Sequence, residues 1–230
     1  DFENGGKTTL LVDLNEGVSD SVCVPLCFSM DYPGAPPAEE TCLILCEKRE
    51  KLFEKARSWY RNLLDKVPQV KTPEKDVNRA LAFSAVSLGQ LRIRNPYLGW
   101  GIVSGFGPSL SSTRPKYAWF FDEITLGAWA FLYLGMDEYV REGFDFLQRF
   151  QREDGKTVHE IDQSYPFRPD YLKAYRYAYI HSDGPVYFLV GYGKYWRQTG
   201  DKDFIAKHWP KIRRTLEWCF SAMDPSDCLI

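Results

Sequence analysis

From Glu47 onward, apolar residues recur at intervals of three and four, and this spacing constrains the fold more than any other feature of the chain. An α-helix has 3.6 residues per turn, so the spacing places the apolar side chains on one face of a helix. A mainly α fold is therefore expected. The predicted helices cover residues 47–67, 72–94, 121–134, 137–151, 185–199 and 202–223.

The connections between these helices alternate in length. Two are short turns, Gly135–Asp137 and Gly200–Lys202, and two are long loops, Tyr97–Lys116 and Arg152–Gly184. Short links join antiparallel neighbours, so the alternation predicts stacked helical hairpins. The long loops then gather on one rim, where a rigid helical scaffold can hold functional residues.

Residues 1–47 have a different pattern. Thr8–Leu14 and Thr41–Cys46 are short apolar runs of a composition that suits strands, separated by the turn-like segment Asp31–Pro37. Two strands have too few partners for a stable sheet. We therefore expect residues 1–47 to be the C-terminal end of an upstream β domain, and residues 48–230 to be a separate helical domain. Both ends of the chain have the character of a fragment of a longer polypeptide.

Composition narrows the class of protein. The chain is 44% hydrophobic and 26% charged, as globular proteins are, and its net charge is -2 without blocks of like charge. Neither nucleic acid nor a membrane is therefore an expected partner. The sequence contains neither a run of about 18 to 20 apolar residues nor a signal-peptide pattern at its start. A cytoplasmic location is the prediction.

Six cysteines include two C-x3-C pairs, Cys23 with Cys27 and Cys42 with Cys46. One interpretation is a structural zinc site, because zinc-binding cysteine pairs are separated by two to four residues. The other places Cys42 and Cys46 on one face of a strand, two steps of its period-2 repeat apart. Disulfides also remain open. We favour the structural interpretation and predict neither a metal nor a cofactor.

The segment Arg114–Glu123 combines four aromatic rings with two adjacent carboxylates, and it follows the glycine-rich stretch Gly99–Gly107. A sugar ring stacks its apolar face on an aromatic ring, while carboxylates accept hydrogen bonds from its hydroxyls. We therefore predict Tyr117 and Trp119 as a stacking platform. The alternative makes the rings core residues and Asp122 and Glu123 first-turn acids of a helix.

Several motifs occur in an order that resembles a known family, the six-hairpin (α/α)6-barrel glycosidases, most closely the glycogen-debranching, amylo-α-1,6-glucosidase-like group. The resemblance covers about residues 48 to 230. In that family a Gly-Arg-Asp or Gly-Gly-Asp sequence follows the aromatic pair, whereas here Asp122 follows Phe121 directly. The matching segments are Gly101–Ser109 with Arg114–Phe121, Gln151–Ile161, Asp183–Phe188, Tyr195–Asp201 and Trp209–Ile212.

The resemblance implies a partial (α/α)6 toroid of helical hairpins, preceded by the end of a β-sandwich domain. It also implies a glycoside hydrolase fragment that acts on α-glucosidic bonds of glycogen-like or related oligosaccharides, by an inverting two-carboxylate mechanism without a cofactor. The partner is then an oligo- or polysaccharide. The general acid and base are expected beyond Ile230. The implied substrate-binding residues are Tyr117, Trp119, Asp122, Glu123, His159, Glu160 and Asp183.

Each of these assignments has a simpler alternative. His159 suits a bridge across a turn, and Asp183 suits a helix N-cap. His181 and the tyrosines between residues 171 and 179 are left unassigned, and His208 is expected to be structural. Other functions also remain open: a non-catalytic carbohydrate- or protein-binding helical module, or an α-rhamnosidase, trehalase or disaccharide phosphorylase on the same scaffold. A terpene cyclase or prenyltransferase toroid is disfavoured because the sequence contains no Asp-rich motif of that kind.

Overall fold

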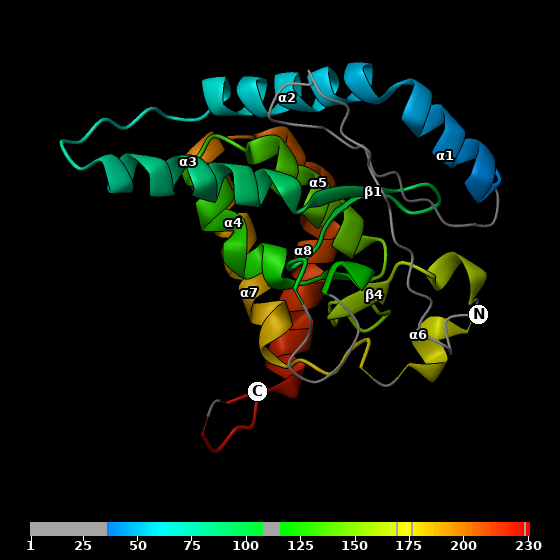
Figure 1. Cartoon of the computed structure of the whole chain (residues 1–230). Helices are drawn as coiled ribbons and strands as arrows, with labels where there is room; N and C mark the ends of the chain where they lie inside the picture. Colours follow the sequence, from blue (N-terminus) through cyan, green and yellow to red (C-terminus); the bar gives the residue numbers. More distant parts are fainter. Residues whose placement is uncertain (1–35, 108–115, 169, 176, 228) are drawn as a thin grey trace, which may run out of the picture. The chain divides into compact units, whose positions relative to one another are not determined.

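The computed structural model describes residues 36–107, 116–168, 170–175, 177–227 and 229–230, and it is mainly helical (Figure 1). The chain divides into two compact units, residues 1–58 and residues 59–230. The predicted boundary after residue 47 precedes helix α2 (Arg49–Lys66), whereas the observed division falls inside that helix. None of the helices in the described ranges combines the length and the apolar composition of a membrane span.

In the first unit, the strand predicted at Thr41–Cys46 is wrong. These residues belong to helix α1, Ala38–Glu47. The helix follows Pro37, and two acidic residues occupy its first turn, where the helix dipole favours negative charge. Cys42 and Cys46 then lie one turn apart on the same helical face, and burial together with Cys46 raises the pKa of the Cys42 thiol. The β domain was predicted from two strands, and one of them, Thr41–Cys46, is thus part of a helix.

Several other predictions for this part of the chain lie outside the described residues. They are the strand at Thr8–Leu14, most of the turn-like segment Asp31–Pro37, and the pair Cys23 and Cys27. The β-sandwich and zinc interpretations therefore stay predictions.

Helix α3 (Lys75–Gln90) confirms that the apolar spacing in this segment encodes a helix. Its two ends differ from the predicted bounds of residues 72 and 94. Thr72 does not cap the helix; its backbone N–H donates to Asn78 Oδ1 at 2.8 Å, and Asn78 Nδ2 donates to the Thr72 carbonyl oxygen at 2.9 Å. Gly89 allows α2 to approach, because a Cβ there would lie 2.5 Å from Leu63 Cδ2. The helix ends at Gln90 rather than Arg94.

The residues after α3 form a β-hairpin, so the predicted loop Tyr97–Lys116 is partly wrong. Strand β1 (Arg92–Asn95) pairs antiparallel with β2 (Gly99–Ile102). Asn95 organises the turn: its Oδ1 accepts hydrogen bonds from the backbone N–H groups of Tyr97 and Leu98. Gly99 completes the turn with a φ of 83°, which glycine adopts without steric cost.

A second pair of strands joins two distant parts of the chain. Strand β3 (Trp119–Phe121) follows the short 3-10 helix η2 (Lys116–Ala118) and pairs antiparallel with β4 (Glu160–Asp162). The predicted helix start at Phe121 is therefore two residues early, because α4 covers Glu123–Tyr133. The predicted long loop 152–184 also contains the 3-10 helix η3 (Tyr165–Phe167) and the short helix α6 (Tyr171–Ala174).

The remaining helices confirm the predicted hairpins and their short turns. Helix α4 packs against α5 (Asp137–Gln148) and α7 (Asp183–Thr199), and α7 packs against α8 (Lys202–Ala222). Gly135 and Gly200 supply the left-handed backbone of the two turns, with φ values of 70° and 68°. The buried core of the second unit lies where these helices meet β2, β3 and β4.

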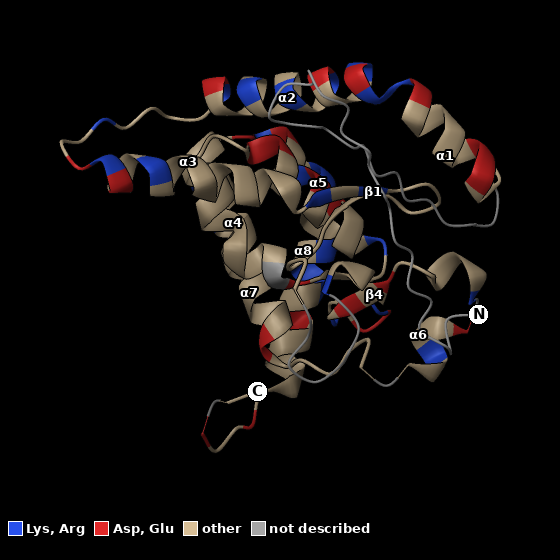
Figure 2. Cartoon of the chain, viewed as in Figure 1, with Lys and Arg blue, Asp and Glu red and all other residues tan. Residues whose placement is uncertain are grey.

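Exposed apolar side chains follow α4 and α7. Figure 2 shows α4 without charge after its first residue, whereas acidic and basic residues alternate along α2. A helix that is apolar around most of its circumference is normally covered by other structure. The exposed large side chains of the two helices are Leu126, Trp129, Tyr133, Val186, Tyr187, Val190 and Trp196.

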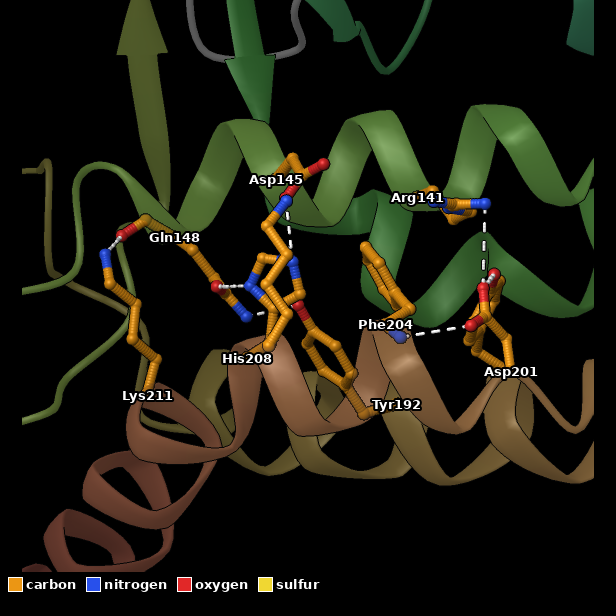
Figure 3. A network of polar contacts seen from close by, with 10 residues as sticks. Arg141, Asp145, Gln148, Tyr192, Asp201, Phe204, His208 and Lys211 are labelled. Carbon is orange, nitrogen blue, oxygen red and sulfur yellow. Dashed lines mark hydrogen bonds and ion pairs between the residues drawn. The ribbon is translucent and has the colours of Figure 1, made fainter.

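A network of polar contacts connects α5, α7 and α8 (Figure 3). His208, buried on α8, places Nδ1 against Gln148 Oε1 and Nε2 2.8 Å from Asp145 Oδ1. The side-chain amide of Gln148 also donates to the Tyr192 hydroxyl, and Lys211 donates to the Gln148 carbonyl oxygen. His208 is thus buried within a polar network, as a structural role would require, and that role stays a prediction.

The His208 network predicts a pH-dependent stability. Burial lowers the pKa of His208 below the ordinary value of 6.5, so the unfolded chain binds a proton over a pH range in which the folded chain does not. The free energy of unfolding is therefore highest above pH 6.5 and falls as the pH drops below it, with a slope of at most about 1.4 kcal/mol per pH unit from this group. Urea unfolding of wild type and His208→Gln between pH 7.5 and 5 measures it. Identical pH dependence in both proteins would contradict the prediction.

Candidate functional site

Three segments that lie far apart in the sequence meet at the start of α7. Asp122 stands between β3 and α4, His159 and Glu160 stand at the start of β4, and His181 and Asp183 stand at the beginning of α7. The β3–β4 ladder aligns the first two segments, because Phe121 pairs with Glu160. We call the five side chains the carboxylate–histidine cluster. Four of them are residues that the family resemblance assigned to substrate contact.

Asp122 lies at the centre of this cluster and is buried. Its Oδ1 lies 3.0 Å from His159 Nδ1, and its Oδ2 lies 3.6 Å from His181 Nδ1. The backbone N–H of Asp122 donates to the His159 carbonyl oxygen at 2.8 Å. Asp122 occupies the N-cap position of α4, but its side chain makes no cap hydrogen bond. The carboxylate is thus directed at the two histidines and not at its own helix.

His159 lies between two carboxylates. Its Nδ1 contacts Asp122, and its Nε2 lies 3.6 Å from Glu160 Oε2. The Nδ1 contact has the length of a hydrogen bond, whereas the Nε2 contact is longer than one. The His159 backbone N–H donates to the Ala178 carbonyl oxygen at 2.6 Å, which holds this segment against the residues that precede α7.

Glu160 is buried and is oriented by a tyrosine. The Tyr175 hydroxyl donates a hydrogen bond to Glu160 Oε1, which leaves Oε2 facing His159. Tyr175 belongs to the tyrosine series that sequence reasoning left unassigned. Tyr175 comes directly after α6, so this short helix within the long loop positions the tyrosine that contacts Glu160.

His181 and Asp183 form the solvent-facing side of the cluster. The side chain of His181 is 43% exposed and that of Asp183 is 64% exposed, and His181 Nδ1 lies 3.8 Å from Asp183 Oδ1. The rings of His181 and His159 have centroids 3.5 Å apart. Asp183 is the first residue of α7, and the N-cap position belongs to Ser182. The capping alternative for Asp183 is therefore not observed.

Gly184 brings α7 close to the central carboxylate. A Cβ at Gly184 would lie 2.5 Å from Asp122 Oδ2 and 3.5 Å from Thr157 Oγ1. Thr157 is buried, and its hydroxyl has no hydrogen-bond partner among the residues that the structure describes. The Thr157 hydroxyl is thus a buried group with unused hydrogen-bonding capacity at the edge of the cluster, and Gly184 lies near both it and the Asp122 carboxylate.

Trp119 and Tyr117 lie outside the cluster. Trp119 is buried in β3 with its ring centroid 6.1 Å from that of Phe121, while Tyr117 is exposed beside Phe106. Glu123 begins α4, and its side chain is outside the described part of the structure. Of the two predicted platform residues, Tyr117 has the exposed ring, and the stacking platform stays a prediction.

Two cavities of the second unit lie beside α4 and between α5 and α8. One, of about 280 Å³, is lined by apolar residues that include Phe121 and Ile124, with Lys116 and Ser104 as its polar members. The other is a cleft of about 650 Å³ lined by Trp100 and by charged residues of α5 and α8, among them Lys207 and Arg214. Neither is lined by a member of the carboxylate–histidine cluster.

The fold and the site define a mainly helical protein with a partly buried carboxylate–histidine cluster at a helix start. A scan against models of known protein families finds none that matches the chain. A search of curated proteins likewise finds no match.

Proposed function

We propose that the chain is part of a six-hairpin glycoside hydrolase that acts on α-glucosidic bonds of glycogen-like or related oligosaccharides. The observation that carries the proposal is the convergence of Asp122, His159, Glu160 and Asp183. These residues were named from motifs in three separate segments, and they lie around one point at the start of α7.

The chemistry of the cluster suits a saccharide ligand. Carboxylates accept hydrogen bonds from sugar hydroxyls, and bonds to a charged partner contribute about 1.5–3 kcal/mol. Asp183 and His181 are accessible to such a ligand, while Asp122 and Glu160 are held by their neighbours. Tyr117 provides an exposed ring for stacking. Exposed groups that bind and buried groups that orient them are typical of small-molecule sites.

The partial (α/α)6 toroid and the upstream β-sandwich belong to the same proposal. Two consecutive helical hairpins, α4 with α5 and α7 with α8, are its repeating unit. The apolar side chains exposed on α4 and α7 support a larger closed assembly of helices, because contiguous apolar surface is normally covered. An inverting mechanism and a cytoplasmic location complete the proposal.

A binding role without turnover is the second candidate. Asp122 and Glu160 are both engaged, the first by two histidines and the second by Tyr175. A carboxyl group that is held in this way suits the positioning of a substrate better than proton donation to a leaving group. Among the described cluster residues, Asp183 is the carboxylate most accessible to solvent.

Saccharide binding by the chain tests the proposal. Calorimetric titration with short branched α-glucans is expected to show binding that Asp183→Asn weakens by about 10- to 100-fold, the value of one hydrogen bond to a charged group. Asp203→Asn, an exposed first-turn acid of α8, is the matched control and leaves binding unchanged. Glucose release is measured in parallel. Binding with release supports the hydrolase, binding alone supports the second candidate, and a folded chain that binds no α-glucan overturns the proposal.

A further inference from the structure

We propose that Asp122, His159 and His181 form a binding site for one divalent transition-metal ion, with zinc as the best match. This inference departs from the sequence-based prediction of no metal, and it does not depend on the proposed carbohydrate function. One ligand atom from each residue lies within 4.8 Å of the others. Two histidine nitrogens and a carboxylate oxygen are a donor set that suits zinc.

The donor atoms lie near one another, and binding an ion would draw them closer. Zinc binds histidine nitrogen and carboxylate oxygen at about 2.0–2.2 Å, so neighbouring donors in a tetrahedral site are about 3.3 Å apart. Asp122 Oδ1 lies 3.0 Å from His159 Nδ1, and its other oxygen, Oδ2, lies 3.6 Å from His181 Nδ1, so the carboxylate faces each histidine with a different oxygen.

Glu160 has the position of an outer-shell carboxylate. A histidine that binds a metal through one nitrogen usually donates its other N–H to a carboxylate, which fixes the tautomer and the ring orientation. Glu160 Oε2 lies 3.6 Å from His159 Nε2, and Tyr175 holds the opposite oxygen of Glu160. With the proton on Nε2, Nδ1 is free to bind a cation.

The backbone holds the ligands in place before any ion binds. Asp122 and His159 are joined by a backbone hydrogen bond of 2.8 Å, and His159 is bonded to Ala178, three residues before His181. Thr157 adds an independent observation, because its buried hydroxyl has no partner within the described residues and lies next to Asp122 across Gly184. A water molecule bound to the ion could donate a hydrogen bond to that hydroxyl oxygen.

One side of the site is open. The His181 side chain is 43% exposed, and Asp183 lies beside it at the surface. Three protein ligands with a fourth position left to water or substrate are the arrangement found in catalytic zinc sites, whereas structural zinc sites have four protein ligands. Calcium and magnesium are disfavoured, because both prefer all-oxygen sites.

Zinc and cobalt titrations test the site. The 230-residue chain, freed of metal by a chelator, is titrated with Zn²⁺ in a calorimeter and with Co²⁺ in a spectrophotometer, in reducing buffer. We expect one ion per chain, with the visible absorption of four-coordinate Co²⁺ and without the thiolate charge-transfer bands that binding to cysteines would produce. His181→Ala should weaken binding by at least about 100-fold, and Glu160→Gln by about 10- to 100-fold.

Controls separate the proposed site from other binding. His208→Gln removes the chain's third histidine and should bind Zn²⁺ as wild type does, and circular dichroism checks that each variant is folded. His181 is exposed, so its loss is not expected to unfold the chain. A folded chain that binds no ion, binding that persists in His181→Ala, or thiolate bands would each overturn the inference. Titrations without saccharide keep this result separate from the glucan-binding test, which is run both with chelator and with Zn²⁺.

Discussion

Replacing Phe120 with alanine is expected to lower the free energy of unfolding by about 3–5 kcal/mol, the usual cost of removing a buried aromatic side chain. Phe120 is fully buried in β3, where it pairs with Ile161 and bridges to Val103. Its ring lies against Gly101, where a Cβ would come within 2.5 Å of Phe120 Cδ1, and its centroid is 4.4 Å from that of Phe146. The substitution therefore opens a cavity between the hairpin, the second strand pair and α5.

Urea unfolding followed by circular dichroism measures this loss. Phe220→Ala is the matched control, because Phe220 is exposed on α8, and its stability should stay within about 0.5 kcal/mol of wild type. Equal effects of the two substitutions would show that Phe120 does not organise the core. Because β3 aligns Asp122 with β4, we also expect Phe120→Ala to weaken binding at the carboxylate–histidine cluster.

Replacing Gly155 with alanine is expected to destabilise the chain by about 2–5 kcal/mol. Gly155 has a φ of 101°, which an L-residue adopts at a cost of about 1–2 kcal/mol. Its added Cβ would lie 2.1 Å from the Arg214 carbonyl oxygen, and such overpacking costs about 1–3 kcal/mol more. The carbonyl oxygen of Gly155 accepts hydrogen bonds from Gln151 and Thr215, so the strain would also disturb the contact with α8.

Gly193→Ala provides the control. Gly193 lies within α7 and is exposed, and a Cβ there would meet no atom within 4 Å. Alanine should therefore stabilise the helix by about 0.5–1 kcal/mol. Thermal unfolding of the two variants should give shifts of opposite sign. A Gly155→Ala protein as stable as wild type would mean that the loop before β4 can move away from α8.

The carboxylate–histidine cluster was only partly predictable from sequence. Asp122, His159, Glu160 and Asp183 were named because their motifs resemble those of a glycosidase family. His181 was missed, although it is two residues from Asp183, because nothing local shows that its ring turns towards Asp122. Tyr175 and Thr157 were also missed. Tyr175 acts on Glu160, which is 15 residues away in the chain. Thr157 comes near the cluster only because Gly184 packs closely against both.

The sequence alone determined the helices α4, α5, α7 and α8 and the short turns within the two hairpins that they form. Apolar spacing encodes one buried face per helix, and Gly135 and Gly200 encode left-handed turns, so both signals are local. Tertiary structure decided the rest. Whether Arg92–Asn95 continues a helix or pairs with β2 depends on a partner strand, and Thr41–Cys46 suits helix and strand alike by composition. The cluster exists only because β3 pairs with β4 and α7 begins beside Asp122, contacts between residues that are far apart in the chain.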